Sequence, residues 1–202
     1  MNANKSLTEQ KLKYYQSSGI SNLTKKHYDI RLTKNYSYGL SKIVLLDHDL
    51  RLIFYAIPTF KDGKPVANKS GEKQHEHQYT IEVQFVKADK IMDFDDPEGM
   101  EKSGLKKAMQ KIIDSCDLKF YSDDPSFYWQ GFWENLDAKD SAIYPFKGTK
   151  GKDTWEARHA MAGGLVDTKI RVTKHIAQIL IDMDTYKDEV ANRISRGVYE
   201  YD

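Results

Sequence analysis

The stretch YTIEVQF, residues 79–85, is the clearest strand in the sequence. Every second residue in it is apolar, and the residues between them, Thr80, Glu82 and Gln84, are polar. Side chains of a strand point alternately to the two faces of a sheet, so this alternation predicts a strand with one face against a core. The neighbouring elements can be placed by working outward from it.

Toward the N-terminus, the sequence indicates more strands. Residues 36–46 and 50–57 flank the polar triplet 47–49, which is the spacing of a hairpin. Residues 28–32 also alternate apolar and charged side chains. The polar stretch 58–78 contains Gly and Pro and is too long for an ordinary turn, so we expect a long exposed loop there.

Toward the C-terminus, the apolar spacing changes to that of helices. Helices are predicted over residues 100–114, 168–183 and 185–196, with a short strand at 116–122. Strands dominate the first half and helices the second. The predicted fold class is therefore α+β, with an antiparallel β-sheet or a barrel-like N-terminal half and helices in the C-terminal half.

The predicted organisation is one compact domain with an appendage. Residues 1–20 form an N-terminal arm or helix, with a capping-box spacing that begins at Ser6. Residues 21–95 form the β-rich half and residues 96–202 the helical half. We expect the arm and the 58–78 loop to become ordered only on binding partners, because they are polar and poor in core-forming residues.

Composition excludes several classes of protein. The 202 residues carry 31 Lys and Arg against 30 Asp and Glu, so a net charge of +1 gives no general attraction for nucleic acid or an acidic membrane. One cysteine, Cys116, excludes an internal disulfide and any multi-cysteine metal site, and we expect it to be a small buried residue. No apolar leader or membrane-length run occurs, which predicts a soluble protein.

Two short segments about fifty residues apart have the frame of a metal site. The first is Ser122-x-Asp124-Pro125-x-Phe127, and the second is Thr173-Lys174-His175-Ile176. Together they resemble a SWIM-type zinc finger, which pairs CxC, often followed by Pro and an aromatic residue, with a distant CxH at the start of a helix. The resemblance covers about residues 120–180 and places the four ligand positions at Ser122, Asp124, Thr173 and His175.

Only His175 keeps a zinc ligand of the SWIM type. The three thiolates that supply most of such a site's affinity are missing, and hydroxyls are poor zinc ligands, so we expect no bound zinc. Hydrogen bonds and aromatic packing would then replace the metal as the link between strand and helix. The residues predicted to form this structural frame and its buried cluster are Ser122, Asp124, Pro125, Phe127, Trp129, Trp133, Thr173 and His175.

Other candidate sites have simpler interpretations. His75 and His77 would share a face of a strand, but the sequence does not show a third metal ligand, so an exposed strand start is the favoured reading. The acidic residues 93–98 fit a turn before a helix rather than a Ca²⁺ loop. Three lysines of a Gly-rich loop, Lys147, Lys150 and Lys152, could contact nucleic acid. No catalytic signature occurs, and no enzyme activity or cofactor is predicted.

The resemblance implies two functions. One is a structural component of a tailed-bacteriophage virion, in the neck, connector or tail, made in the host cytoplasm and located in the virion. Such a protein would act in a ring through contacts with copies of itself and with other virion proteins, with at most a weak DNA contact and no membrane contact. The alternative is a nucleic-acid-binding module that uses the SWIM-like frame and the basic loop.

Overall fold

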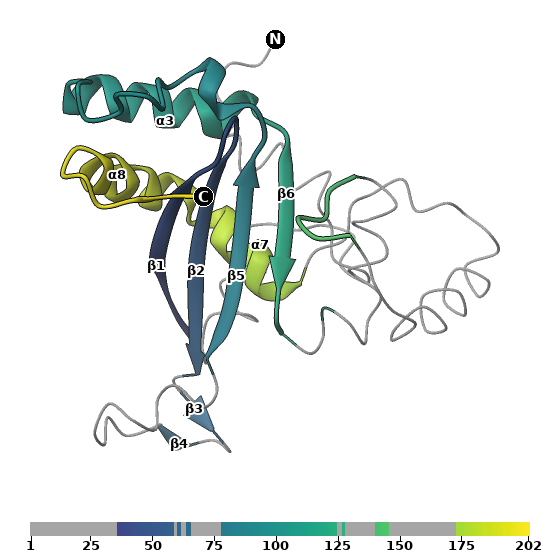
Figure 1. Cartoon of the computed structure of the whole chain (residues 1–202). Coiled ribbons are helices and arrows are strands. Elements are labelled where there is room, and N and C mark those ends of the chain that lie inside the picture. Colours follow the sequence, from purple (N-terminus) through teal and green to yellow (C-terminus); the bar gives the residue numbers. More distant parts are fainter. Residues whose placement is uncertain are drawn as a thin grey trace, which may run out of the picture.

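A computed structural model describes residues 36–58, 60–61, 64–65, 78–124, 127, 140–145 and 173–202 of the protein (Figure 1). Its centre is a five-stranded sheet with the strand order β6-β5-β2-β1-β7. The strands are β1 (Tyr36–Leu45), β2 (Leu50–Pro58), β5 (Tyr79–Phe85), β6 (Leu118–Ser122) and β7 (Glu200–Tyr201). The short strands β3 (Phe60–Lys61) and β4 (Lys64–Pro65) pair with each other.

The three central strands follow from their alternating side chains. β1 pairs with β2 and β2 with β5, all antiparallel, and the turn between β1 and β2 is closed by a bond from the Leu46 amide to the Asp49 carbonyl, 2.9 Å long. One face of this sheet is apolar and fully buried: Leu50, Leu52, Phe54, Ala56, Ile81, Val83 and Phe85. A bulge after Leu40 keeps Ile43 and Leu45 of β1 buried with them.

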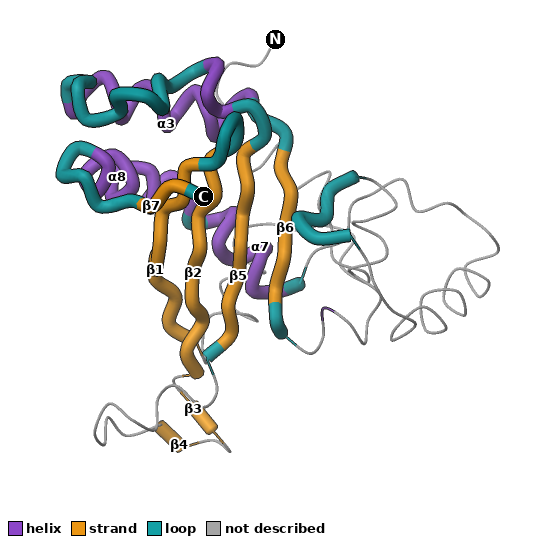
Figure 2. Tube along the Cα trace, viewed as in Figure 1, coloured by secondary structure: helices purple, strands orange, loops and turns teal. Residues whose placement is uncertain are grey.

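Both edges of the sheet are partly covered. Residues 140–145 run beside β6 through a parallel bridge between Phe120 and Ala142. At the other edge, β7 pairs in parallel with Val44 and Leu45 of β1 (Figure 2). Arg193 covers the bulge by donating bonds of 2.9 Å to the Leu40 and Ser41 carbonyls. Such coverage limits strand addition at an edge.

The helices bury the apolar face of the sheet. They are α3 (Lys102–Ser115), α7 (Lys174–Ile181) and α8 (Met183–Ile194), and α7 runs behind β5 and β6 in the view of Figure 1. Residues 175–180 of α7 are all buried. α3 and α8 pack on each other and bring Lys106 within 3.1 Å of Asp188. After α8, Gly197 takes a φ of 66° and its amide bonds to Ile194, which ends the helix and leads the chain toward β7.

This architecture confirms the α+β prediction, with one refinement. The sheet is open and mixed rather than barrel-like, because β7 joins it in parallel and its edges do not close. Two of its strands, β6 and β7, come from the half of the chain in which helices dominate. The helix predicted over 168–183 corresponds to α7, which ends at Ile181, and α8 begins at Met183, two residues earlier than predicted. The first five residues of that predicted helix, 168–172, lie outside the described residues.

Cys116 is buried, as predicted. The predictions for the 1–20 arm, the strand at 28–32 and most of the 58–78 loop lie outside the described residues. In the described part of the chain, no helix is both long and apolar enough to span a membrane.

Candidate functional site

The two halves of the SWIM-like frame meet in the structure. β6 ends at Ser122, and α7 begins directly after Thr173. The strand end and the helix start lie against each other, because Asp124 and His175 approach within 3.4 Å. Thr173 caps the helix, since its hydroxyl accepts a bond of 3.3 Å from the Ile176 amide. The Ser122 hydroxyl accepts a bond of 3.2 Å from the Asp124 amide. Both hydroxyls therefore stabilise local backbone.

Asp124 and His175 form the contact between strand end and helix. The His175 Nε2 lies 3.4 Å from the Asp124 carboxylate, and both residues are buried. On the other side of the ring, Nδ1 lies 2.9 Å from the Tyr38 hydroxyl. A carboxylate only accepts, so the geometry fits a ring protonated at Nε2, with Tyr38 donating to Nδ1 when the ring is neutral. Burial raises the pKa of the Tyr38 hydroxyl, which therefore keeps its proton at neutral pH.

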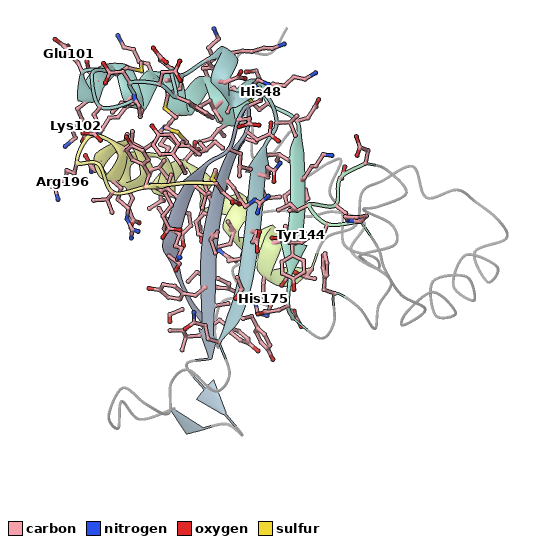
Figure 3. All side chains as sticks on the ribbon, in the orientation of Figure 1. His48, Glu101, Lys102, Tyr144, His175 and Arg196 are labelled. Carbon is pink, nitrogen blue, oxygen red and sulfur yellow. The ribbon has the colours of Figure 1, made fainter. Side chains whose placement is uncertain are left out.

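Three tyrosine rings lie within 6 Å of the imidazole of His175, which is labelled in Figure 3. Tyr36 packs against His175 edge to face with ring centroids 4.6 Å apart, and Tyr79 lies at 5.3 Å. Burial is the main cause of the raised pKa of both tyrosines. We call Tyr36, Tyr38, Tyr79, Asp124 and His175 the inner cluster. It joins strands β1 and β5, the end of β6 and the first turn of α7.

Phe127 follows the turn after β6 that contains Asp124, and it is fully buried, as predicted. Its amide bonds to the Asp124 carbonyl at 2.8 Å, which closes the turn that presents Asp124. Its ring packs edge to face on Tyr121 with centroids 5.9 Å apart. The same turn is joined to β5, because the backbone amide of Thr80 donates a bond of 2.7 Å to the Asp123 carboxylate. The position of Asp124 is thus fixed from both sides.

The possible ligand atoms of the frame can be compared with those that a tetrahedral zinc ion needs. Two ligands of a tetrahedral zinc lie about 3.4 Å apart, which is close to the separation of His175 Nε2 and Asp124 Oδ2. The other two positions, Ser122 and Thr173, offer hydroxyls that already accept bonds from amides. In the described residues, no group of three or more His, Cys, Asp or Glu could hold a metal ion. The donor set does not fit a structural zinc.

The opposite face of the sheet carries a second polar cluster, which sequence reasoning missed. Glu82 of β5 is buried, and its carboxylate accepts a bond of 3.1 Å from the Tyr144 hydroxyl. Arg51 of β2 lies 3.5 Å from the same carboxylate and donates to Gln84 at 2.9 and 3.0 Å. We call Arg51, Glu82, Gln84 and Tyr144 the outer cluster. Arg51 is 33 residues from Gln84 and 93 residues from Tyr144 in the chain, so no local pattern could reveal the cluster.

Burial raises the pKa of the Glu82 carboxyl, and the nearby Asp123 adds to this effect. Arg51 and the hydrogen bond from Tyr144 act in the opposite direction but do not cancel it. Burial also raises the pKa of the Tyr144 phenol, so Tyr144 remains a donor at neutral pH. A buried carboxyl with a raised pKa is typical of functional sites, but structural ion pairs have the same property.

Several predicted site residues lie outside the described residues. These are Pro125, Trp129 and Trp133 of the frame, His75 and His77, and the basic loop residues Lys147, Lys150 and Lys152. Of the acidic residues before α3, Asp93 and Asp96 accept bonds from the Asp95 and Gly99 amides, both 3.0 Å long, as expected of a turn.

Comparison with known proteins gives no relative for this chain. No protein-family model, no curated protein and no solved structure matches it.

Proposed function

We propose that this protein is a structural component of a tailed-bacteriophage virion, in the neck or tail, that acts in a ring through contacts with copies of itself and with other virion proteins. The virion assignment rests on the resemblance of the SWIM-like frame and on the size and aromatic content of the chain. Its structure supports the mode of action, which is contact rather than chemistry.

The observation that carries the proposal is the burial of the frame. Ser122, Asp124, Thr173 and His175 are all buried, with exposed fractions of 0 to 6%. Groups enclosed to this degree cannot meet a substrate or a phosphate backbone from solvent. They serve to hold α7 against the sheet, which favours a scaffold over a module that binds nucleic acid through the frame.

Other features fit contact with neighbouring chains. Strands β3 and β4 extend the β2 end of the sheet away from the helices (Figure 1). Val198 and Tyr201, in the C-terminal tail, expose 52% and 63% of their surface. Extensions of this kind, and exposed apolar side chains near an edge, are suited to interfaces between subunits.

Mass measurement in solution, combined with DNA binding at several salt concentrations, tests the proposal. The expected result is a multimer of the 23.4 kDa chain that has no steep dependence of DNA affinity on salt. A monomer whose DNA affinity falls with a log–log salt slope of about −3, the value for three phosphate contacts, would contradict it. A monomer without DNA affinity would also contradict the ring.

Matched variants locate the contacts. Val198→Ser removes an exposed apolar side chain from the C-terminal tail and is expected to lower the mass of the multimer. Lys107→Ser, an exposed change on α3, is the control and should leave the mass unchanged. For DNA, Lys147→Gln with Lys150→Gln and Lys152→Gln can be compared with Lys107→Gln and Lys111→Gln; a loss of binding specific to the loop would favour the nucleic-acid alternative.

A further inference from the structure

We propose that the C-terminal tail, residues 198–202, is exchanged between neighbouring copies of the chain, so that β7 of one copy pairs with β1 of the next. This inference rests on the proposed ring and names one contact that joins its subunits. It concerns the β1 edge of the sheet, where the tail, the helix before it and the residues that it contacts are all described (Figure 2).

The backbone of the tail binds to β1. β7 pairs in parallel with Val44 and Leu45, and the Asp202 amide donates a bond of 3.1 Å to the Leu45 carbonyl. Beside this pairing, the Glu200 carboxylate lies 3.0 Å from the Lys42 ammonium, and both side chains are more than half exposed. The backbone bonds and the ion pair both lie at an edge of the sheet that a second chain can reach.

Two tyrosines attach the tail to the turn before α3. The Tyr201 hydroxyl donates to the Phe94 carbonyl, and the Tyr199 hydroxyl donates to the Glu98 carboxylate, both at 2.9 Å. Every copy of the chain presents the same turn and the same edge of β1. A tail from a neighbouring copy can therefore make each of the bonds that the chain's own tail makes, which is the condition for exchange of an element between subunits.

Gly197 is the hinge that this exchange needs. It ends α8 with a φ of 66°, its amide bonds to the Ile194 carbonyl at 2.9 Å, and the chain then turns toward β1. Glycine adopts positive and negative φ about equally, so the tail can also leave α8 in another direction without backbone strain. That change gives up the bond of 2.9 Å from the Val198 amide to the Arg193 carbonyl, at an end of the helix where water can replace it.

Exposed apolar surface favours the exchanged arrangement. Three large apolar side chains are exposed in the described part of the chain, and two of them, Val198 and Tyr201, lie in the tail with 52% and 63% of their surface in solvent. A tail that crosses to a neighbour lies between two copies, where both side chains can be covered. Because the bonds of the tail are the same in both arrangements, this added burial of apolar surface decides between them.

Cross-linking of the full-length protein tests the exchange. Lys42→Cys and Glu200→Cys in one chain place two thiols at an observed contact of the tail, and the native Cys116 is buried. The protein is treated with a short bis-maleimide and denatured, and its mass is measured. Exchange predicts linked chains with masses at multiples of 23.4 kDa. The matched control, Lys107→Cys with Glu200→Cys, should link no chains to each other.

A mixture makes the test independent of links within one chain. When a Lys42→Cys chain and a Glu200→Cys chain are co-expressed, exchange predicts linked pairs that contain one chain of each kind. Either chain expressed alone should give no such pairs.

The outcomes separate the exchange from the ring. Links only within single chains, in a protein whose native mass is that of a multimer, would overturn the exchange and leave the ring intact. The same links in a monomer would overturn both. Linked chains that stop at two would support the exchange and contradict the ring. No link of either kind in the double variant would also overturn the exchange, because the contact between residues 42 and 200 would then be absent.

Discussion

The inner and outer clusters place similar chemistry on opposite faces of one sheet. Each pairs a buried carboxylate with a nitrogen-containing side chain and a tyrosine: Asp124 with His175 and Tyr38, and Glu82 with Arg51 and Tyr144. The imidazole of the inner cluster is fully buried, whereas Tyr144 of the outer cluster is 40% exposed. The comparison teaches that similar sets of polar groups can be closed off from solvent on the face that the helices cover and remain within reach of solvent on the other face.

The largest expected effect is on the anchor of the inner cluster. Phe127→Ala removes a fully buried ring behind the turn that presents Asp124, so the free energy of unfolding should fall by about 3–5 kcal/mol. Denaturant unfolding measures this loss, and Phe127→Leu should show a smaller one. A loss below about 1 kcal/mol for the alanine variant would mean that this ring contributes little to stability. The contrast between the inner and outer clusters would then not hold.

The two carboxylate contacts should differ in strength. Asp124→Ala leaves His175 buried beside an empty position and should cost about 2–4 kcal/mol of unfolding free energy. Tyr144→Phe removes a hydroxyl that solvent can partly replace and should cost about 0.5–1.5 kcal/mol. Measuring His175→Ala alone and together with Asp124→Ala completes a double-mutant cycle. A coupling energy near zero would show that the two residues do not stabilise each other.

The pH dependence of stability tests the outer cluster separately, through Glu82. The pKa of Glu82 is raised in the folded protein, mainly by burial, so its contribution to stability is complete below the pKa of an unfolded glutamate, about 4.3. That contribution is lost as the pH rises through the folded pKa. Glu82→Gln should therefore show a smaller fall in stability between acidic and neutral pH than the wild-type chain. An identical pH profile for both proteins would argue against a raised pKa.

The smallest effect is expected at the sheet edge. Lys42 and Glu200 lie 3.0 Å apart, but their side chains are 53% and 56% exposed, and such pairs contribute little. Lys42→Ala should change the unfolding free energy by no more than about 0.5 kcal/mol. A loss comparable to that of Asp124→Ala would mean that burial does not distinguish the contacts of this protein.

Much of the local structure could be predicted from sequence. The strand at 79–85 has the predicted bounds, and the hairpin strands and α3 differ from theirs by one or two residues. These elements have strong periodicity and clear turn residues. The predicted break between α7 and α8 lies two residues after the observed one, because Met183 continues the apolar spacing of α7 although it is the first residue of α8.

The long-range arrangement was only partly predictable. The spacing of the SWIM-like frame predicts that the strand end near Ser122 lies against the start of the helix, and the structure places Asp124 within 3.4 Å of His175. The tyrosines around His175 were not foreseen, because Tyr38 is 137 residues away from it and pairing across that distance leaves no local pattern. The outer cluster was missed for the same reason, and β7 because two residues are too few to show an alternation.

The central claim is that the link between β6 and α7 is made by protein groups without a metal. Elemental analysis of the purified full-length chain, with unfolding measured before and after treatment with a chelator, tests it most directly. The account predicts far less than one zinc per chain and an unfolding curve that the chelator does not change. Near one zinc per chain, with stability lost on chelation, would contradict it, because the 3.4 Å between His175 and Asp124 would then be the separation of two zinc ligands.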